Sequence, residues 1–248
     1  MNLAGRRVLV TGASSGIGRA TAVMAASLGA DVVLTGRRED ELARTAGMME
    51  RPEEHRTLAG DLKDAAFIDR LAAFAAEGGR LDGFVHAAGT CRVAPVGVAG
   101  PAVLEDSMSV GYVAFMLLMR RLSARTVSND GFSAVAVSSV SASAGWPGGS
   151  TYAGCKGAVE AAVRSLAVEL APRRIRVNAV CPAHVDTPLF RNLTAGMDDA
   201  AKTALVAKQP LGLVRPEQVA AAACFLLSPA SSAVTGVSLP VDGGYLAQ

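Results

Sequence analysis

Cysteine, aromatic residues and charge of one sign are all scarce in this sequence. Its 248 residues include 4 cysteines and 1 tryptophan, and the formal net charge is only +2. No C-x-x-C pair occurs and no cysteine has a metal-like spacing to a histidine, which argues against a disulfide framework and against a metal site. Basic residues occur in pairs at most, so no strong positive field for nucleic acid is expected. The cysteines are Cys91, Cys155, Cys181 and Cys224.

Two kinds of segment are also missing. Residues 1–7 lead straight into an apolar strand, without the charged and apolar regions of a signal peptide. No apolar run reaches the length that spans a membrane. We therefore expect a cytoplasmic protein with reduced thiols and with neither nucleic-acid nor membrane partners.

Alternating short and long apolar segments dominate the chain. Half of the residues are apolar, and short Val/Leu-rich runs alternate with longer Ala-rich runs of helical period. This pattern indicates a parallel sheet covered on both faces. We predict one α/β domain over residues 1–248, a doubly wound parallel sheet of about seven strands with helices on both faces. Strands are expected at residues 6–11, 31–35, 55–59, 83–86, 132–138, 175–180 and 237–241, and helices at 16–28, 39–49, 64–77, 101–125, 150–170 and 216–227.

One long segment lacks a strong periodic signal. Residues 182–210 are predicted to be irregular. Long irregular inserts in compact domains are often functional lids, so residues 183–210 are expected to form a mobile substrate lid.

A glycine-rich turn joins the first predicted strand to the first predicted helix. Thr11–Gly18 has the sequence TGASSGIG, so the glycine spacing is G-x-x-x-G-x-G. Glycine lets the backbone approach a pyrophosphate closely, and the following helix N-terminus favours negative charge. An ordinary glycine-rich turn is the alternative, but the strand, turn and helix context favours a dinucleotide site. The residues expected to contact the dinucleotide are Gly12, Ser14, Ser15, Gly16, Ile17 and Gly18.

A tyrosine and a lysine are spaced to act together. Tyr152 and Lys156 stand four residues apart in a predicted helix, so they share one face. An ammonium beside a phenol lowers the pKa of the phenol, and a general acid works best with a pKa near the working pH. Ser139 lies 13 residues upstream of Tyr152. The Tyr/Lys spacing occurs by chance on many helices, and the glycine-rich turn is what gives it weight.

Together these motifs resemble the short-chain dehydrogenase/reductase family, of the 3-oxoacyl-carrier-protein reductase type. The resemblance covers nearly the whole chain and depends on several motifs in the right order. It implies a Rossmann-type fold and a nicotinamide cofactor. The motifs are TGASSGIG at 11–18, GDL at 60–62, HAAG at 86–89, Ser138-Ser139, Tyr152-x-x-x-Lys156, RVNAVCP at 176–182 and VDGG at 241–244.

The resemblance implies a role for each of three candidate catalytic residues. Tyr152 would exchange a proton with the carbonyl or alcohol oxygen, and Ser139 would orient that oxygen. Lys156 would hold the nicotinamide ribose and lower the pKa of Tyr152. Further cofactor contacts are implied for Asp61, Leu62, Ala88, Gly89, Pro182, Val185 and Thr187.

The choice of cofactor follows from the end of the second predicted strand. An acidic residue there would hold the ribose 2′-hydroxyl of NAD. Gly36 occupies that position and is followed by Arg37 and Arg38, whose guanidinium groups suit a 2′-phosphate. We therefore predict NADP(H) rather than NAD(H). The alternative is that the two arginines are simply solvent-exposed residues at the start of the next helix.

The sequence departs from the family pattern in three places. Gly111 stands where the family has an Asn that supports a water-linked proton relay to the lysine. His86 and Ala87 replace two Asn residues near the cofactor, and we expect a structural role for His86. Ala183 replaces a Gly beside the nicotinamide. The departure at Gly111 leaves open a second function, a weakly active or non-catalytic NADP-binding sensor or scaffold.

The substrate is expected to be a small carbonyl or alcohol compound in a mostly apolar pocket. The predicted helices at residues 101–125 and 150–170 are rich in Ala, Val, Leu and Met on more than one face, which indicates burial on both sides. The resemblance implies a homotetramer formed through these helices. The predicted pocket residues are Cys91, Val93, Ser141, Trp146, His184, Leu189 and Phe190.

Overall fold

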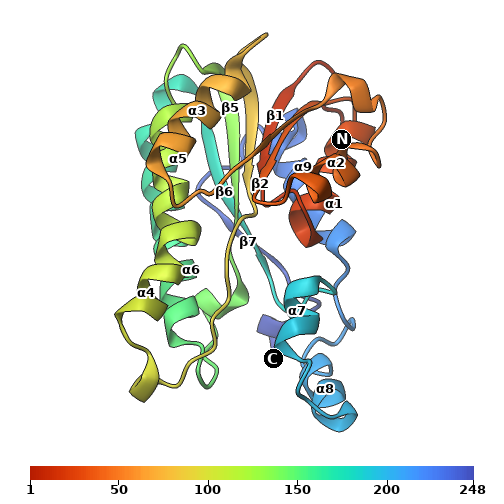
Figure 1. The fold of residues 1–248 in the computed structure, drawn as a ribbon, viewed down its shortest axis with the longest axis vertical. Helices are drawn as coiled ribbons and strands as arrows, with labels where there is room; N and C mark the ends of the chain where they lie inside the picture. Colours follow the sequence, from red (N-terminus) through yellow and green to blue (C-terminus); the bar gives the residue numbers. More distant parts are fainter.

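Seven parallel strands form one sheet at the centre of the structure, a computed structural model that describes residues 1–248. The strand order is β3-β2-β1-β4-β5-β6-β7 (Figure 1). The chain runs from β1 to one edge and then restarts at β4 beside β1, as in a doubly wound sheet. The predicted fold class is therefore confirmed. The strands are β1 Arg7–Thr11, β2 Asp31–Gly36, β3 Arg56–Ala59, β4 Leu81–His86, β5 Ser128–Val137, β6 Arg176–Pro182 and β7 Ser238–Val241.

Helices cover both faces of this sheet, as Figure 1 shows. One buried cluster packs α3, α5 and α6 against the sheet and includes Phe67 and Phe115. The opposite cluster joins α1 and α9 through small residues, among them Ala22 and Ala223, which let the two helices approach closely. The helices are α1 Gly16–Ser27, α2 Glu39–Ala46, α3 Ala65–Ala76, α4 Pro101–Met108, α5 Ala114–Leu122, α6 Ser150–Glu169, α7 Pro188–Leu193, α8 Asp199–Val206 and α9 Pro216–Leu227.

The long helix predicted at residues 101–125 is interrupted. A π-helical turn, Ser109–Val113, joins α4 to α5 and has Gly111 buried at its centre. Such turns add one residue to a helical turn and are frequent at functional sites. A Cβ added at Gly111 would lie 2.5 Å from Sγ of Cys155. The π-turn therefore packs directly on α6, at the residue before Lys156.

The segment at residues 182–210 is not irregular, contrary to the sequence prediction. It contains the two short helices α7 and α8. The Thr187 hydroxyl caps α7 by accepting from the Phe190 N–H at 3.3 Å, and the Asp198 carboxylate caps α8 by accepting from the Ala201 N–H at 2.7 Å. Helices of 6 and 8 residues are too short to produce a strong periodic pattern. The capping residues Thr187 and Asp198 were the sequence features from which the starts of these helices could have been predicted.

One helical stretch reaches the length and hydropathy of a membrane span, contrary to the expectation from the sequence. It covers Pro101–Leu122, with 22 residues and a mean hydropathy of 1.4. Its α5 portion buries Phe115, Leu118 and Leu122 in the core cluster beside the sheet. Core packing therefore accounts for the apolar residues of α5, whereas Leu104 and Val113 of the same stretch are exposed.

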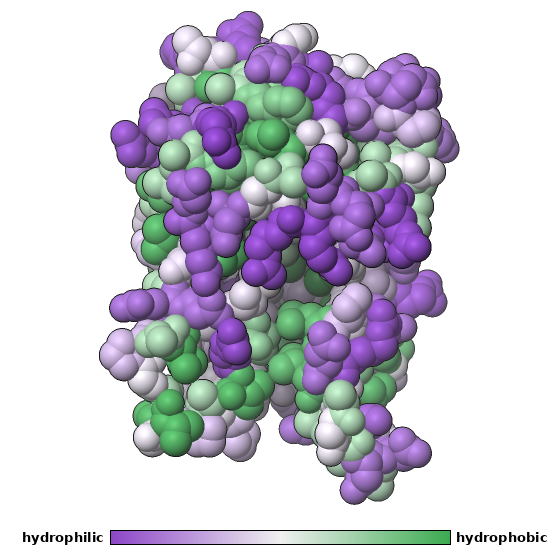
Figure 2. Space-filling view, viewed as in Figure 1, coloured by the Kyte–Doolittle hydropathy of each residue, from purple (hydrophilic) through white to green (hydrophobic).

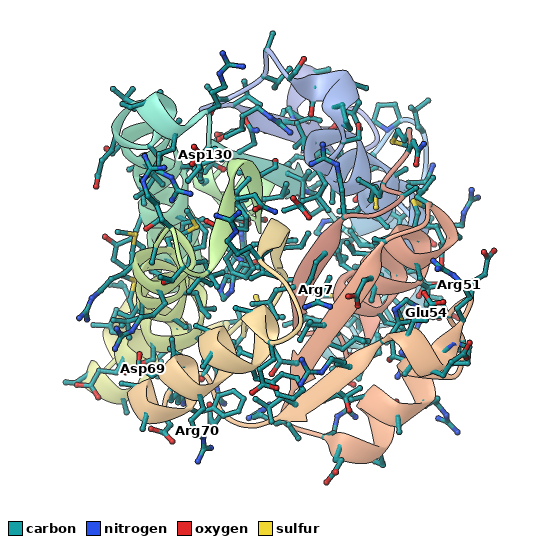
Figure 3. The ribbon with its side chains drawn as sticks, turned by 90° about the horizontal axis from the view of Figure 1, so that it is seen from above. Arg7, Arg51, Glu54, Asp69, Arg70 and Asp130 are labelled. Carbon is teal, nitrogen blue, oxygen red and sulfur yellow. The ribbon has the colours of Figure 1, made fainter.

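The edge of the sheet where β1 begins carries ion pairs. Arg7 donates to the Asp31 carboxylate at 2.7 Å and occupies the centre of the view in Figure 3. Arg51 and Glu54, an ion pair, lie to one side of it, and Asp69 lies on the other. The Arg7–Asp31 pair joins the starts of β1 and β2, and the predicted motifs lie at the opposite ends of the strands.

Candidate active site

The carboxyl ends of β1 and β4 meet at the switch point of the sheet. Thr11, the last residue of β1, pairs in register with His86, the last residue of β4. In doubly wound sheets, ligands bind outside the carboxyl ends of the strands where the order reverses. The glycine-rich turn leaves β1 and the HAAG motif leaves β4 at this point, so both motifs face one crevice.

The glycine-rich turn is too tightly packed to hold side chains at two of its glycines. A Cβ added at Gly12 would lie 2.7 Å from the backbone nitrogen of Ala88, and one at Gly18 would collide with the carbonyl oxygen of Gly12. Ser15 is the N-cap of α1 and makes no side-chain capping bond, so the first N–H groups of the helix remain available. This cradle fits the pyrophosphate of a dinucleotide.

His86 holds the crevice together where the family has Asn. Its Nδ1 lies 3.1 Å from the Thr11 hydroxyl, and its Nε2 lies 3.0 Å from the carbonyl oxygen of Val110 in the π-turn. Burial, and secondarily the charge of Lys156, lower the pKa of His86 to about 4. The imidazole is therefore neutral at pH 7, which agrees with the predicted structural role.

Ser139, Tyr152 and Lys156 converge from two elements. Ser139 follows β5, and its Oγ accepts from the Ser141 N–H at 3.1 Å. Tyr152 and Lys156 lie on one face of α6, with Nζ of the lysine 5.6 Å from the centroid of the phenol ring. The same Nζ donates to the carbonyl oxygen of Val137 at 2.7 Å, which fixes the ammonium beside the end of β5.

The pKa of Tyr152 moves in the direction opposite to the sequence expectation. Burial is the largest influence and raises this pKa, while a hydrogen bond with Ser139 acts in the opposite direction. Burial also lowers the pKa of Lys156. The net shift is therefore away from the working pH, and not toward it as the sequence led us to expect, because the cost of burying a phenolate is the largest influence. The lowering of this pKa by Lys156 stays a prediction. Tyr152 thus holds its proton firmly at neutral pH.

These three residues open into a cavity with a volume of about 690 Å³. Figure 2 shows a hollow in the lower half of the molecule with hydrophobic residues on both of its sides. All the residues predicted for the substrate pocket line the cavity, namely Cys91, Val93, Ser141, Trp146, His184, Leu189 and Phe190. The predicted cofactor residues that line it are Ile17, Gly89, Tyr152, Lys156, Pro182, Val185 and Thr187.

The start of α7 lies against the glycine-rich turn. A Cβ added at Gly16 would lie 3.1 Å from the methyl group of Thr187. Ala183, which replaces the family Gly, lines the cavity just before this point. The segment that carries α7 and α8 therefore forms a wall shared by the predicted cofactor and substrate regions.

The two arginines after β2 lie close to the glycine-rich turn. A Cβ added at Gly36 would lie 3.3 Å from the Ser14 hydroxyl. Nη2 of Arg38 donates to the Ser14 carbonyl oxygen at 3.4 Å, and the Arg37 side chain has no hydrogen bond or ion pair. Both arginines are exposed, so the two residues that follow β2 present guanidinium groups. The Glu41 carboxylate also lies near the turn, but it is paired with Arg19, which donates to the Ser14 carbonyl oxygen at 2.6 Å.

The GDL motif ends β3 at the far side of the crevice. The Gly60 N–H donates to the carbonyl oxygen of Gly36 at 2.9 Å, which ties the motif to β2. Asp61 is exposed, whereas Leu62 is buried in the core cluster. Asp61 therefore presents the only side chain of the motif at this edge.

The cavity also contains residues that the motifs did not indicate. Thr90 comes from the loop after β4, Lys208 follows α8, and Tyr245 follows β7. Oγ1 of Thr90 and Nε2 of His184 are buried without a hydrogen-bond partner, so both are available to a ligand. Tyr245 directly follows the VDGG motif, so its place near the site could have been predicted from the sequence. No motif lies near Lys208, so its place in the cavity could not.

Comparisons with known proteins agree with this geometry. A family model described as enoyl-(acyl carrier protein) reductase matches residues 12–246. The cis-4-hydroxycyclohexanecarboxylate dehydrogenase of Sinomonas cyclohexanicum is 39% identical over 253 residues, covering 98% of this chain and 97% of that protein. A short-chain dehydrogenase/reductase of the glucose/ribitol dehydrogenase type from Brucella melitensis has a TM-score of 0.91 at 31% identity, with 99% of each chain covered. A structure from Beutenbergia cavernae, which holds NADP at low occupancy, has a TM-score of 0.89 at 33% identity, covering 100% of this chain and 99% of that one.

Proposed function

This chain belongs to the short-chain dehydrogenase/reductase family, and from that premise we propose that it is a cytoplasmic NADP(H)-dependent oxidoreductase. It transfers a hydride between the nicotinamide and a carbonyl compound or secondary alcohol. The convergence of Ser139, Tyr152 and Lys156 on one cavity carries this proposal. We also propose that α7 and α8 act as the lid of that cavity.

The protein groups supply proton transfer and orientation. The bound dinucleotide supplies or accepts the hydride. Tyr152 holds its proton at neutral pH and donates it to the carbonyl oxygen as that oxygen gains charge. The Ser139 hydroxyl orients the same oxygen. Lys156 is a buried cation on the same helix face, and its charge stabilises the phenolate that remains after proton transfer.

The preference for NADP(H) rests on Arg37 and Arg38. Both guanidinium groups are exposed directly after β2, and Arg38 already reaches the turn through the Ser14 carbonyl oxygen. A 2′-phosphate there would gain charge-assisted hydrogen bonds, and an NAD ribose would find no carboxylate at Gly36, the residue that ends β2.

We expect kcat/KM with NADPH to exceed that with NADH about tenfold or more, the effect of one charge-assisted hydrogen bond of roughly 1.5–3 kcal/mol. The measurement is NADPH and NADH oxidation over a panel of ketones, diketones and 3-oxoacyl thioesters. Replacing Arg37 and Arg38 together by Ala should lower the ratio of kcat/KM for NADPH to kcat/KM for NADH, mainly because KM for NADPH rises. Equal kcat/KM values, or a preference for NADH, would reject the assignment.

A sensor or scaffold that binds NADP without turnover is the second candidate. The observation that favours it is Gly111 in place of the relay Asn. Tight NADPH binding with no turnover of any carbonyl in the same panel would support this function over the enzyme.

We propose a homotetramer formed through α4, α5 and α6. Leu104 on α4, Val113 at the end of the π-turn and Val168 on α6 are exposed by 47%, 44% and 78%. A second copy of the chain would cover this apolar surface. Light scattering after size exclusion should give four times the mass of 25.3 kDa for one chain. A stable monomer would contradict the proposal.

A further inference from the structure

No acidic side chain lines the main cavity, although three basic ones do. Two of the three are engaged elsewhere. Nζ of Lys156 donates to the Val137 carbonyl oxygen at 2.7 Å, and Nε of Arg92 donates to the Asp106 carboxylate at 3.0 Å. The third, Lys208, forms no ion pair and its ammonium group makes no hydrogen bond. It is the free positive charge of the cavity.

The backbone at Lys208 is held in place from both sides. The buried side chain of Gln209 accepts from the His184 N–H at 2.7 Å and donates to the His184 carbonyl oxygen at 3.1 Å. The Gln248 side chain donates to the Lys208 carbonyl oxygen at 2.7 Å. The backbone of Lys208 is therefore fixed beside His184, and its exposed side chain is one of those that line the cavity.

The cavity walls around this charge are apolar. Trp146, Leu189 and Phe190 line them, and the His184 ring packs 5.5 Å from the Phe190 ring. Burial, and secondarily the charge of Lys208, lower the pKa of His184, so its imidazole is neutral at pH 7. Lys208 is thus the one basic side chain of the cavity that has neither an ion-pair nor a hydrogen-bond partner.

We infer that the substrate is an apolar carbonyl or alcohol compound bearing a carboxylate, and that Lys208 is the residue that selects it. The reacting oxygen lies at Tyr152, and the carboxylate lies at the end of the cavity formed by Lys208 and the unpartnered Nε2 of His184. This inference rests on the proposed function. Lys208 is exposed beside the apolar walls, so its ammonium discriminates an anion from a neutral isostere by a charge-assisted contact that solvent partly screens.

Binding can be measured independently of turnover because Trp146 is the only tryptophan and lines the cavity. The enzyme with NADP⁺ bound is titrated with cyclohexanecarboxylate and with cyclohexanecarboxamide while tryptophan fluorescence is recorded. Lys208→Gln removes the charge and Lys208→Arg keeps it. Lys202→Gln is the matched control, since Lys202 lies on α8 but does not line the cavity.

We expect the native enzyme to bind the carboxylate about five- to tenfold more tightly than the amide, allowing for the partial exposure of Lys208. Lys208→Gln should abolish this preference, and Lys208→Arg and Lys202→Gln should keep it. The inference is overturned if native binding is equal or undetectable for both probes, or if Lys208→Gln keeps the preference. It is also overturned if Lys208→Gln weakens NADP⁺ binding instead.

A parallel assay separates this inference from the function on which it rests. Turnover is measured with 4-oxocyclohexanecarboxylate and its amide. Turnover of both ketones at equal KM would overturn the inference and leave the reductase function intact. A carboxylate preference in binding without turnover of any ketone would support the inference and count against the reductase function.

Discussion

Replacing Tyr152 by Phe is expected to lower kcat for ketone reduction about 10²–10⁴-fold, the contribution of a positioned general acid. The substitution removes the proton that burial holds on the phenol and leaves the ring in place. The affinity for NADPH should be retained, because the glycine-rich turn and Lys156 are unchanged. Steady-state kinetics with a ketone from the panel and NADPH titration by fluorescence measure the two quantities separately.

Tyr112 supplies the matched control for this substitution. It lies in the π-turn and does not line the cavity. Tyr112→Phe should therefore keep native turnover. A Tyr152→Phe variant with native kcat would show that another group donates the proton, and the role given to Tyr152 would be wrong.

Introducing Asn at Gly111 is expected to destabilise the protein. The added Cβ would lie 2.5 Å from Sγ of Cys155, in a buried contact between the π-turn and α6. Overpacking of this kind costs about 1–3 kcal/mol of unfolding free energy. For a chain of this length Tm falls by roughly 2–4 °C for each kcal/mol. Thermal unfolding of the Gly111→Asn variant measures the loss.

A second substitution, Cys155→Ala, separates the steric effect from the proton relay. It removes Sγ, which otherwise donates to the Ser107 carbonyl oxygen at 3.2 Å. We expect the double variant to recover most of the Tm lost by Gly111→Asn, which a double-mutant cycle would register as coupling. If the losses of Tm from the two single substitutions simply add in the double variant, the two residues do not compete for the same space. The kcat of the double variant tests the proton relay separately. It should stay close to native, since Ser139, Tyr152 and Lys156 are intact. A large gain in kcat would show that the missing Asn limits the native relay.

Much of this site could be predicted because its requirements are local. Gly12 and Gly18 of the turn are set by close backbone approaches, and glycine is the only residue type that permits them. The i and i+4 spacing of Tyr152 and Lys156 places them on one helix face whatever surrounds them. The order of the seven strands follows from the hydrophobic pattern, and each strand overlaps the range that the pattern predicts.

What the sequence could not provide depends on packing between distant segments. The contact of Gly111 with Cys155 joins residues on separate helices, so the replacement of Asn by Gly had no visible cause in the sequence. The pKa of Tyr152 depends on how deeply the phenol is buried, which a spacing rule does not contain. Lys208 lines the cavity next to Gln209, whose buried side chain joins this segment to His184. No local motif marks that arrangement.

The most direct test of the account is to follow the hydride itself. The enzyme is incubated with a ketone from the panel and with NADPH carrying deuterium at both C4 positions of the dihydronicotinamide, and the product is analysed by mass spectrometry. The account predicts an alcohol with one deuterium on its carbinol carbon from the native enzyme, and a drastically slower appearance of that product from Tyr152→Phe. Tight binding of NADPH with no deuterated product from any carbonyl in the panel would contradict it.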